Sequence, residues 1–458
     1  MVSAPDDRAR IADRLEADGI DLVRFLWVDH NSITRGKAVS RHALASRMES
    51  GIGLARTRQA SALSDLGVPV AGFDAVGEVR LVPDPASYVR LPHAPGSAAM
   101  LCDLRTPEGE PWEACPRTFL KQALAAAAGF DVVAAFEPEF TLCAGPPTPG
   151  RLGLFDDSLC FDNEGFDAAN TYAVRLVRAL RGEGLDVETY HPEFAHGQHE
   201  LTLRHAPAVR AADQYVWQRA ITRGLARDMG LWATFAPVPH PGLRGNGNHA
   251  HLSLWSPAAQ DGEAVNLFAD AADPLGLSGL ARHFIGGLLD HLPGLTALTC
   301  ASANSYRRLQ PGMWAGAFGA WGPDNREAAI RIPSRLSGDE AGSTNIEVKI
   351  CDSTANPYLA LGALIHAGLD GIRRRLDPGE PLREDPNALS DDALRRRGVT
   401  PLPRSLEEAV EALERDDFLM SALGPVRGAL YTAIKRADIR DAKDMGSAAE
   451  HHTHAVRY

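Results

Sequence analysis

The sequence has no long apolar run and no excess of positive charge, and both absences exclude classes of function. One of the most apolar stretches, Phe284 to Leu298, is interrupted by Asp290, His291 and Pro293. It therefore falls short of the roughly 20 apolar residues that a membrane helix needs. The 47 basic residues are outnumbered by 59 acidic ones, which gives a net charge of −12 with His neutral. Because nucleic acids and anionic membranes are bound through basic patches, we expect neither partner.

The sequence also has no paired cysteines and no apolar leader. Six cysteines are spread without a CxxC pair, at positions 102, 115, 143, 160, 300 and 351. Such spacing is typical of free thiols in a reducing compartment, and not of a disulfide framework or a zinc site. Residues 1–10 are polar and charged, unlike the apolar core of a signal peptide. We therefore expect a cytoplasmic protein.

The length of 458 residues, with 45% hydrophobic and 23% charged residues, predicts two domains of an ordinary soluble kind. A stretch rich in turn-forming residues, 103–112, marks the boundary. Strand-like runs precede it, and strand-like and helical runs alternate after it. One helix is predicted to start at Asn356 and Pro357, as N-cap and first helical position. This mixture predicts an α+β fold, with one domain of residues 1–106 and another of residues 107–458.

Four segments arrange polar side chains in a way that directs them to one side. Three of them alternate polar and apolar residues: AFEPEF (135–140), HAHLSL (249–254) and IEVKI (346–350). On a strand, residues two apart share one face. The fourth segment, EFAHGQHE (193–200), has a glutamate at each end of a glycine-containing turn. Each segment taken alone also fits an antiparallel strand or turn with one face in water.

Taken together, the four segments supply five carboxylates and one histidine that could converge: Glu137, Glu139, Glu193, Glu200, Glu347 and His249. Five negative charges cannot lie close together without cations. Two divalent ions would bring about +4 against −5 and nearly balance them. Carboxylate-rich ligation is typical of Mg²⁺ or Mn²⁺. The sequence therefore predicts two such ions in one site.

Arginines are the counterpart of these carboxylates. Arg307, Arg308, Arg326 and Arg331 fall close together in the sequence. The count alone also fits a solvated face with surface salt bridges. However, Arg326 and Arg331 are embedded in apolar and Gly/Ala-rich sequence, where charged groups need buried partners. Polyphosphate oxygens suit the bidentate fork of arginine. Because the sequence lacks a GxxxxGK[ST] motif, the predicted nucleotide site is not a P-loop.

Five motifs, in this order, resemble the signatures of the glutamine synthetase superfamily. They are FEPEF, EFAHGQHE, GNGNHAHLSL, NSYRRLQPG with NREAAIRIP, and NIEVKICDSTANPYLALGA, and they span residues 136 to about 363. The resemblance implies a small N-terminal β-grasp-like domain and a larger C-terminal catalytic domain with a curved antiparallel β-sheet and flanking helices. It also implies a ring-shaped homo-oligomer, a dodecamer, with each active site between neighbouring subunits.

Position by position, the resemblance also implies roles for single residues. One metal would be bound by Glu139, Glu193 and Glu200, and the other by Glu137, His249 and Glu347. The nucleotide would be bound by His251, Ser253, Arg326 and Arg331, and the glutamate substrate by Gly245 and Arg308. Catalytic roles fall to Arg326, Arg308 and Glu347. The implied reaction is ATP-dependent: the γ-carboxylate of glutamate attacks the terminal phosphoryl group, and an amine then displaces phosphate from the γ-glutamyl phosphate.

Departures from the family's pattern concern the amine and the acid. Trp314, in PGMWAG, stands where glutamine synthetases carry a glutamate that helps to hold ammonium. Their Asp-Gly-Ser-Ser motif is absent, and Asp74 is the nearest candidate for its aspartate. An indole in place of an anionic group favours a larger amine through packing or cation–π contact. Lys349 replaces the usual arginine and lacks its bidentate fork, so the acid could differ from glutamate.

We therefore expect a ligase that joins glutamate to an organic amine. The first alternative is an ammonium-using glutamine synthetase with an altered lid. The second is a non-catalytic relative with a structural role. All six metal-ligand positions are kept, and a structural protein has no need of them. The tyrosine that is nucleotidylated in many bacterial glutamine synthetases is also missing, because the comparable stretch is Asn387-Ala388-Leu389.

Overall fold

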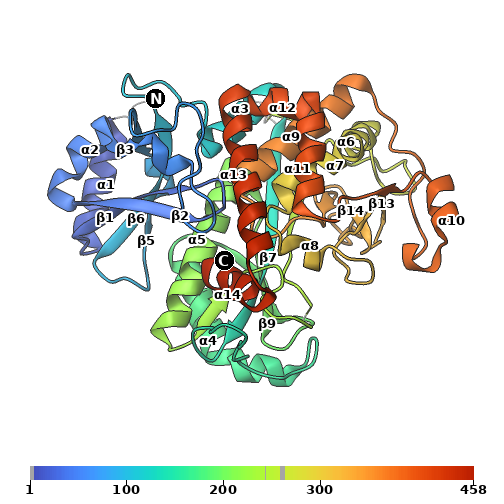
Figure 1. The fold of residues 1–458 in the computed structure, drawn as a ribbon, viewed down its shortest axis with the longest axis horizontal. Helices are drawn as coiled ribbons and strands as arrows, with labels where there is room; N and C mark the ends of the chain where they lie inside the picture. Colours follow the sequence, from blue (N-terminus) through green and yellow to red (C-terminus); the bar gives the residue numbers. More distant parts are fainter. Residues whose placement is uncertain (1–4, 243, 258–263) are drawn as a thin grey trace.

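The N-terminal part of the chain forms a six-stranded sheet (Figure 1). The computed structural model describes residues 5–242, 244–257 and 264–458. The sheet has the order β2-β1-β6-β4-β3, and β5 pairs with β6. Its elements are α1 (Pro5–Ala17), β1 (Leu22–Val28), β2 (Thr34–Ser40), α2 (Leu44–Ser50), β3 (Ile52–Ala55), β4 (Glu78–Pro83), β5 (Val89–Arg90) and β6 (Ser97–Arg105). β1 runs parallel to β6, and the other pairs are antiparallel.

A ten-stranded sheet forms the centre of the remaining chain, in the order β16-β13-β14-β15-β12-β7-β9-β8, with β10 and β11 on β7. Its strands are β7 (Asp131–Cys143), β8 (Val187–Pro192), β9 (Gln198–Leu203), β10 (Ala206–Pro207), β11 (Trp232–Thr234), β12 (Asn248–Trp255), β13 (Phe318–Pro323), β14 (Ala328–Ile332), β15 (Ile346–Val348) and β16 (Thr400–Pro401). The long strand β7 pairs with β12 through Pro138 and with β9 from Glu139 to Thr141. It thus changes partner between its two glutamates.

One pair of this sheet corrects the expected antiparallel arrangement. β13 and β14 run parallel, with Phe318 beside Ala328 and Pro323 beside Ile332. The connection between them contains Asp324 in the left-handed region, at φ 50°. The alternation of apolar and polar residues indicates a strand but carries no information on its direction. The sheet is therefore mixed, and all its other pairs among the described residues are antiparallel.

Helices pack around this second sheet and share its core. They are α3 (Pro116–Ala126), α4 (Asn163–Gly182), α5 (Ala208–Asp228), α6 (Gly279–Asp290), α7 (Leu292–Thr299), α8 (Ser305–Arg308), α9 (Pro357–Arg374), α10 (Asp391–Arg396), α11 (Leu406–Arg415), α12 (Asp417–Leu423), α13 (Pro425–Asp444) and α14 (Ser447–Arg457). The predicted start of α9 is confirmed, because the Asn356 side chain accepts hydrogen bonds from the backbone N–H groups of Tyr358 and Leu359. This cap satisfies donors that the first turn leaves free.

Buried polar contacts join the N-terminal sheet to the rest of the chain. The Asn356 side chain donates to the backbone oxygens of Val28 and Asp29, at 3.2 and 2.8 Å. Arg219 on α5 donates to the side-chain and backbone oxygens of Ser32, at 2.9 and 3.0 Å. Helix α13 also supplies apolar residues, among them Leu430, to the N-terminal core. The end of β1 is therefore fixed to the segment that follows β15.

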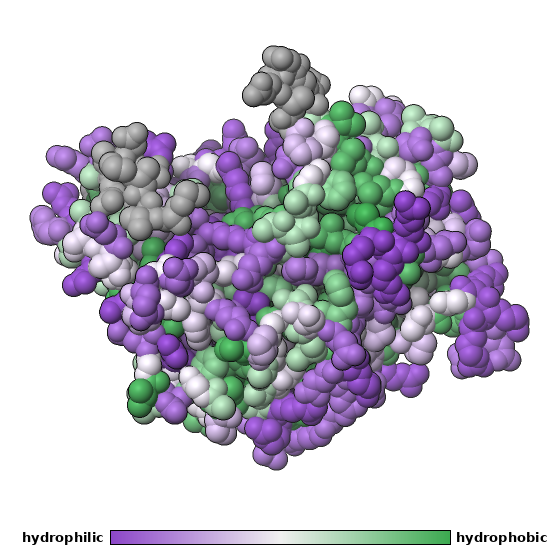
Figure 2. Space-filling view, turned by 90° about the horizontal axis from the view of Figure 1, so that it is seen from above, coloured by the Kyte–Doolittle hydropathy of each residue, from purple (hydrophilic) through white to green (hydrophobic). Residues whose placement is uncertain are grey.

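The observed mixture of sheets and helices confirms the α+β class. The boundary after residue 106, the β-grasp-like domain and the curvature of the larger sheet stay predictions. Within the described residues, no helix combines the length and the apolar character that a membrane crossing requires. Hydrophilic residues cover much of the face seen in Figure 2, and hydrophobic residues gather in patches between them.

Candidate active site

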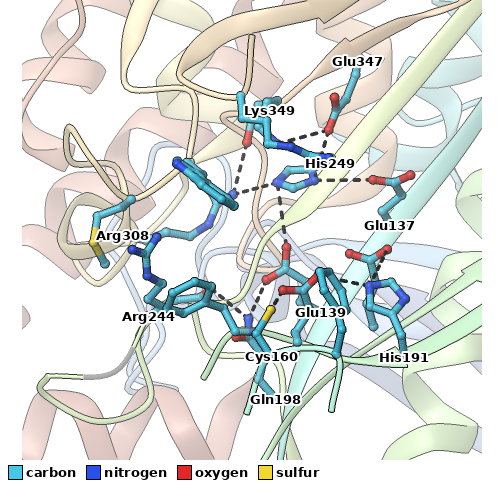
Figure 3. Close-up of a pocket in the computed structure, with 18 of the residues that line it drawn as sticks. Glu137, Glu139, Cys160, His191, Gln198, Arg244, His249, Arg308, Glu347 and Lys349 are labelled. Carbon is cyan, nitrogen blue, oxygen red and sulfur yellow. Dashed lines mark hydrogen bonds and ion pairs between the residues drawn. The ribbon is translucent and has the colours of Figure 1, made fainter. Parts of the chain in front are cut away.

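A cavity of about 540 Å³ lies beside β7, β9, β12 and β15. All the residues predicted for the site line it except His251 and Ser253. They are Glu137, Glu139, Glu193, Glu200, Gly245, His249, Arg308, Trp314, Arg326, Arg331, Glu347 and Lys349. Figure 3 shows His249 among the carboxylates of Glu137, Glu139 and Glu347. Segments far apart in the sequence thus place acidic and basic groups in one cavity.

Strand register brings the carboxylates together. Glu137 on β7 lies beside His249 on β12, and Glu347 on β15 lies beside His251 on β12. On the other side of β7, Glu139 lies beside Glu200 on β9. Because successive side chains of a strand alternate between faces, Glu137 and Glu139 share the face toward the cavity.

The first group of candidate metal ligands surrounds His249. Its Nδ1 atom lies 3.5 Å from Glu137 Oε2 and 3.3 Å from Glu347 Oε1. Burial and the nearby Lys349 lower the pKa of His249 to about 4. A neutral imidazole with carboxylates beside it is a suitable ligand set for a divalent cation. The residues fit the ion that the family resemblance implies.

His251 takes part in the same group, although it does not line the cavity. Its Nε2 atom lies 3.1 Å from Glu137 Oε1, and its Nδ1 atom lies 2.8 Å from Asn345 Oδ1. Although burial alone would lower it, the charge of Glu137 raises the pKa of His251 to about 9. Atoms of Glu137, His251 and Glu347 lie within 4.8 Å of one another. His251 therefore faces the carboxylates, and its predicted contact with the nucleotide stays a prediction.

The second group lies at β8 and β9. His191 Nε2 is 3.0 Å from Glu193 Oε1 and 4.0 Å from Glu200 Oε1. Burial, together with the charges of neighbouring carboxylates, raises the pKa of Glu200 well above its usual range. Burial also raises the pKa of Glu139 to about 7, and the charge of Glu193 adds to this. Carboxylates crowded in this way hold a proton or a cation, so the donor set fits a second divalent ion.

The basic groups differ in how firmly they are engaged. Arg308 is 3% exposed, and it donates to the backbone oxygens of Ile350 and Lys349 at 3.2 Å each. Arg331 Nη1 and Lys349 Nζ contact the two oxygens of Glu347, at 2.8 and 3.2 Å. Arg326 is exposed and makes no ion pair with the described part of the chain. Its guanidinium is therefore free to bind an anion.

A short loop, residues 311–316, presents Trp314 to the cavity. Trp314 has a positive φ of 57° and is 52% exposed. The buried carboxylate of Glu327 fixes the loop, because it accepts the backbone N–H groups of Trp314 at 2.9 Å and Gly312 at 3.2 Å. The Trp314 ring meets that of Phe194 edge to face, with centroids 6.3 Å apart. The cavity thus has an aromatic wall opposite its carboxylates.

Sequence reasoning missed seven lining residues: Cys160, Phe161, His191, Phe194, Gln198, Arg244 and Met313. His191 carried a signal, because it lies two residues before Glu193 on the same strand edge. Gln198 belongs to the quoted motif EFAHGQHE, and it donates to Glu139 Oε2 at 2.6 Å. The others lie in turns and loops, where no periodicity indicates which side chains point inward. Ser253 stays outside the cavity, and its hydroxyl accepts the indole N–H of Trp255 at 2.9 Å.

Two family models cover nearly the whole chain. The model of the glutamine synthetase catalytic domain matches residues 113–454, and that of the glutamine synthetase N-terminal domain matches residues 7–112. The chain belongs to the glutamine synthetase family. The resemblance found in the sequence is thereby confirmed. Members of this family are ATP-dependent ligases of nitrogen metabolism.

Similar proteins within the glutamine synthetase family have different names. A glutamine synthetase of Halobacterium salinarum is 35% identical over 448 residues, which is 96% of this chain and 94% of that protein. A gamma-glutamylpolyamine synthetase of Streptomyces coelicolor is 36% identical over 454 residues, again 96% and 94%. Relatives of similar identity therefore act on different amines by name.

Solved structures agree with this membership of the glutamine synthetase family. A novel glutamine synthase homolog superposes with a TM-score of 0.84 at 35% identity, covering 96% of this chain and 99% of the other. A complex of the protein GmaS with ADP superposes with a TM-score of 0.83 at 29% identity, covering 99% of each chain. The fold is thus shared along nearly the full length.

Proposed function

We propose that this protein is an ATP-dependent ligase that joins the γ-carboxylate of glutamate to an organic amine. The observation that carries the proposal is the aromatic wall of the cavity. Trp314 stands where the family pattern has a glutamate, and Phe194 meets it edge to face. Two partly exposed rings offer apolar contact to a carbon chain, and they offer no anionic cage to ammonium.

Metal binding follows from the two groups of ligands described above. Glu137, His249 and Glu347 would hold one Mg²⁺ or Mn²⁺ ion, and Glu139, Glu193 and Glu200 the other. When bound, such ions offset the charge of a transferring phosphoryl group. His191 keeps the Glu193 carboxylate in place through its 3.0 Å contact.

The chain's own groups position the substrates. Arg308 is held rigidly by backbone oxygens beside Gly245, so it is suited to bind the glutamate substrate. The free guanidinium of Arg326, together with Arg331, is suited to the ATP phosphates. Lys349, buried against Glu347, adds positive charge near the reacting carboxylate. Positioning and charge neutralisation account for most of the catalysis that phosphoryl transfer needs.

The reaction proceeds in two displacements. An oxygen of the glutamate γ-carboxylate attacks the terminal phosphorus of ATP, and the bond from that phosphorus to ADP breaks. The amine nitrogen then attacks the acyl carbon of the γ-glutamyl phosphate. The carbon–oxygen bond breaks, phosphate leaves with the electron pair, and the nitrogen loses a proton to solvent. Activation is necessary because a free carboxylate does not react with amines at neutral pH.

Two similar proteins support the proposal. One is named for γ-glutamyl transfer to polyamines, and another was solved with ADP. The second candidate is an ammonium-using glutamine synthetase, which the name of the Halobacterium relative favours. A non-catalytic role is disfavoured, because all six proposed metal ligands line one cavity.

The test measures phosphate release from ATP with Mg²⁺ and glutamate, with ammonium or one of several organic amines. Preference for an organic amine is expected. The variant Trp314→Glu should raise turnover with ammonium relative to the organic amine, whereas the matched control Trp314→Phe keeps the ring and should keep the preference. Turnover of the wild-type protein with ammonium alone would replace the proposal by the second candidate.

Assembly and location complete the proposal. We propose a ring-shaped homo-oligomer, a dodecamer, in the cytoplasm, and a domain boundary after residue 106. Light scattering of the purified protein measures the mass of the assembly directly. A mass of one or two subunits in an active preparation would contradict the ring.

A further inference from the structure

Arg244 is a lining residue with no assigned role in the reaction. It directly precedes Gly245, and it is half-buried at the aromatic wall of the cavity. Its guanidinium carbon lies 3.9 Å from the centroid of the Phe194 ring and 5.7 Å from that of Trp314. Two rings from different segments therefore hold one cation.

The donors of this guanidinium remain largely free. Arg244 forms no ion pair with any residue that the structure describes, and its printed hydrogen bond to the backbone oxygen of Gly312 is long, at 3.5 Å. Arg308 and Arg331 differ, because each is engaged by oxygens at 3.2 Å or less. Arg326 is also unpaired, but the proposed function assigns it to phosphate. Arg244 is thus a fixed positive charge awaiting an anion.

The wall that carries Arg244 is preformed. Glu327 fixes the loop of Trp314 through two backbone N–H groups, and Phe194 is part of the turn between β8 and β9. The carbon chain of an amine lying against these rings would bring its far end to the guanidinium. A second ammonium group there meets a like charge with little shielding from water, whereas a carboxylate meets a bidentate donor.

We propose that Arg244 determines the specificity for the amine, and that the amine substrate carries a carboxylate at its far end. This inference rests on the proposed function. It separates the chain from its polyamine-specific relative, because a polyamine has a cation where this site expects an anion. Arg244 touches the substrate in this arrangement and takes no part in bond making or breaking.

The test uses three amines of equal carbon number that differ only at the far end: 4-aminobutanoate, butylamine and 1,4-diaminobutane. Phosphate release by the full-length protein gives kcat/KM for each. The wild-type protein should prefer 4-aminobutanoate to 1,4-diaminobutane by about 10- to 100-fold, as expected for opposite and like charges at close range. Arg244→Glu should reverse this order, and Arg244→Gln should reduce it to about that of butylamine.

A matched control is Arg395→Gln, which removes an exposed arginine on α10 and should leave all three values unchanged. If Arg244→Glu does not fold, the order of the three amines in the wild-type protein and in Arg244→Gln decides the matter. A wild-type preference for 1,4-diaminobutane would overturn this inference and leave the amine-ligase function standing. A rise in the KM of glutamate with the amine order unchanged would also overturn it, because Arg244 would then bind the acid. Turnover with ammonium alone would overturn both proposals.

Discussion

Glu327 is expected to control the amine reaction without touching the amine. It is 5% exposed, and its two oxygens hold the backbone N–H groups of Trp314 and Gly312. In Glu327→Gln, one oxygen can still accept an N–H group, but the amide nitrogen faces the other donor. A hydrogen bond to a charged group contributes about 1.5–3 kcal/mol. Because about 1.4 kcal/mol is a factor of ten, kcat/KM for the amine should fall about 10- to 100-fold.

The assay for this prediction is a double-mutant cycle. Phosphate release is measured in the wild-type protein, Glu327→Gln, Trp314→Ala and the double variant. If Glu327 acts by holding Trp314 in place, the double variant should resemble Trp314→Ala alone, since residues in contact are not additive. The exposed residue Glu384 supplies a control, Glu384→Gln, which should be neutral. Additive losses in the cycle, or an unchanged kcat/KM in Glu327→Gln, would refute the reasoning.

Three further predictions concern the metals and the stability of the fold. Removal of divalent cations by a chelator should abolish phosphate release, and added Mg²⁺ should restore it and raise the melting temperature. In Glu200→Gln the melting temperature should respond much less to Mg²⁺, and an equal response would contradict the assignment of Glu200 as a ligand. Arg117, 4% exposed and bidentate to Asp213, should cost about 3–5 kcal/mol of unfolding free energy when replaced by Met, measured by urea denaturation; a loss below about 1 kcal/mol would contradict this. Burial alone would lower the pKa of His291, but the hydrogen bond and charge of Asp416 raise it above the model value of 6.5. Its stabilising contribution is therefore complete below about pH 6.5 and is lost as the pH rises through the folded-state pKa. The difference in unfolding free energy between the wild-type protein and His291→Asn should shrink over that rise, and a difference that grows with pH would show that the sign is wrong.

The sequence was informative where a periodic element carries the chemistry. Alternation placed Glu137 and Glu139 on one face of a strand, and the charge balance of the carboxylates indicated divalent ions before any geometry was known. The cap at Asn356 and Pro357 is equally local, since a side chain and its own next residues decide it. In these cases the relevant contacts lie within a few residues, so the pattern predicts them.

The remaining features depend on contacts between distant segments. Phe194 and Arg244 meet Trp314 only because a turn, a loop and a third segment converge, and none of the three has a period that reports its direction. The parallel pairing of β13 and β14 was missed for the same reason. Ser253 shows the converse limit, because the correct face of β12 was predicted, while the hydroxyl is engaged by its neighbour Trp255.

The change of partner along β7 links the integrity of the active site to the registration of a single strand. Glu137 is aligned by β12 and Glu139 by β9. A slip of one residue would turn both carboxylates to the opposite face together. A misregistered chain therefore loses both halves of the metal centre at once, and no half-competent species arises by this route. Cation binding, in turn, rewards only the correctly aligned strand, so the substrates' ions also serve as a proofreader of folding.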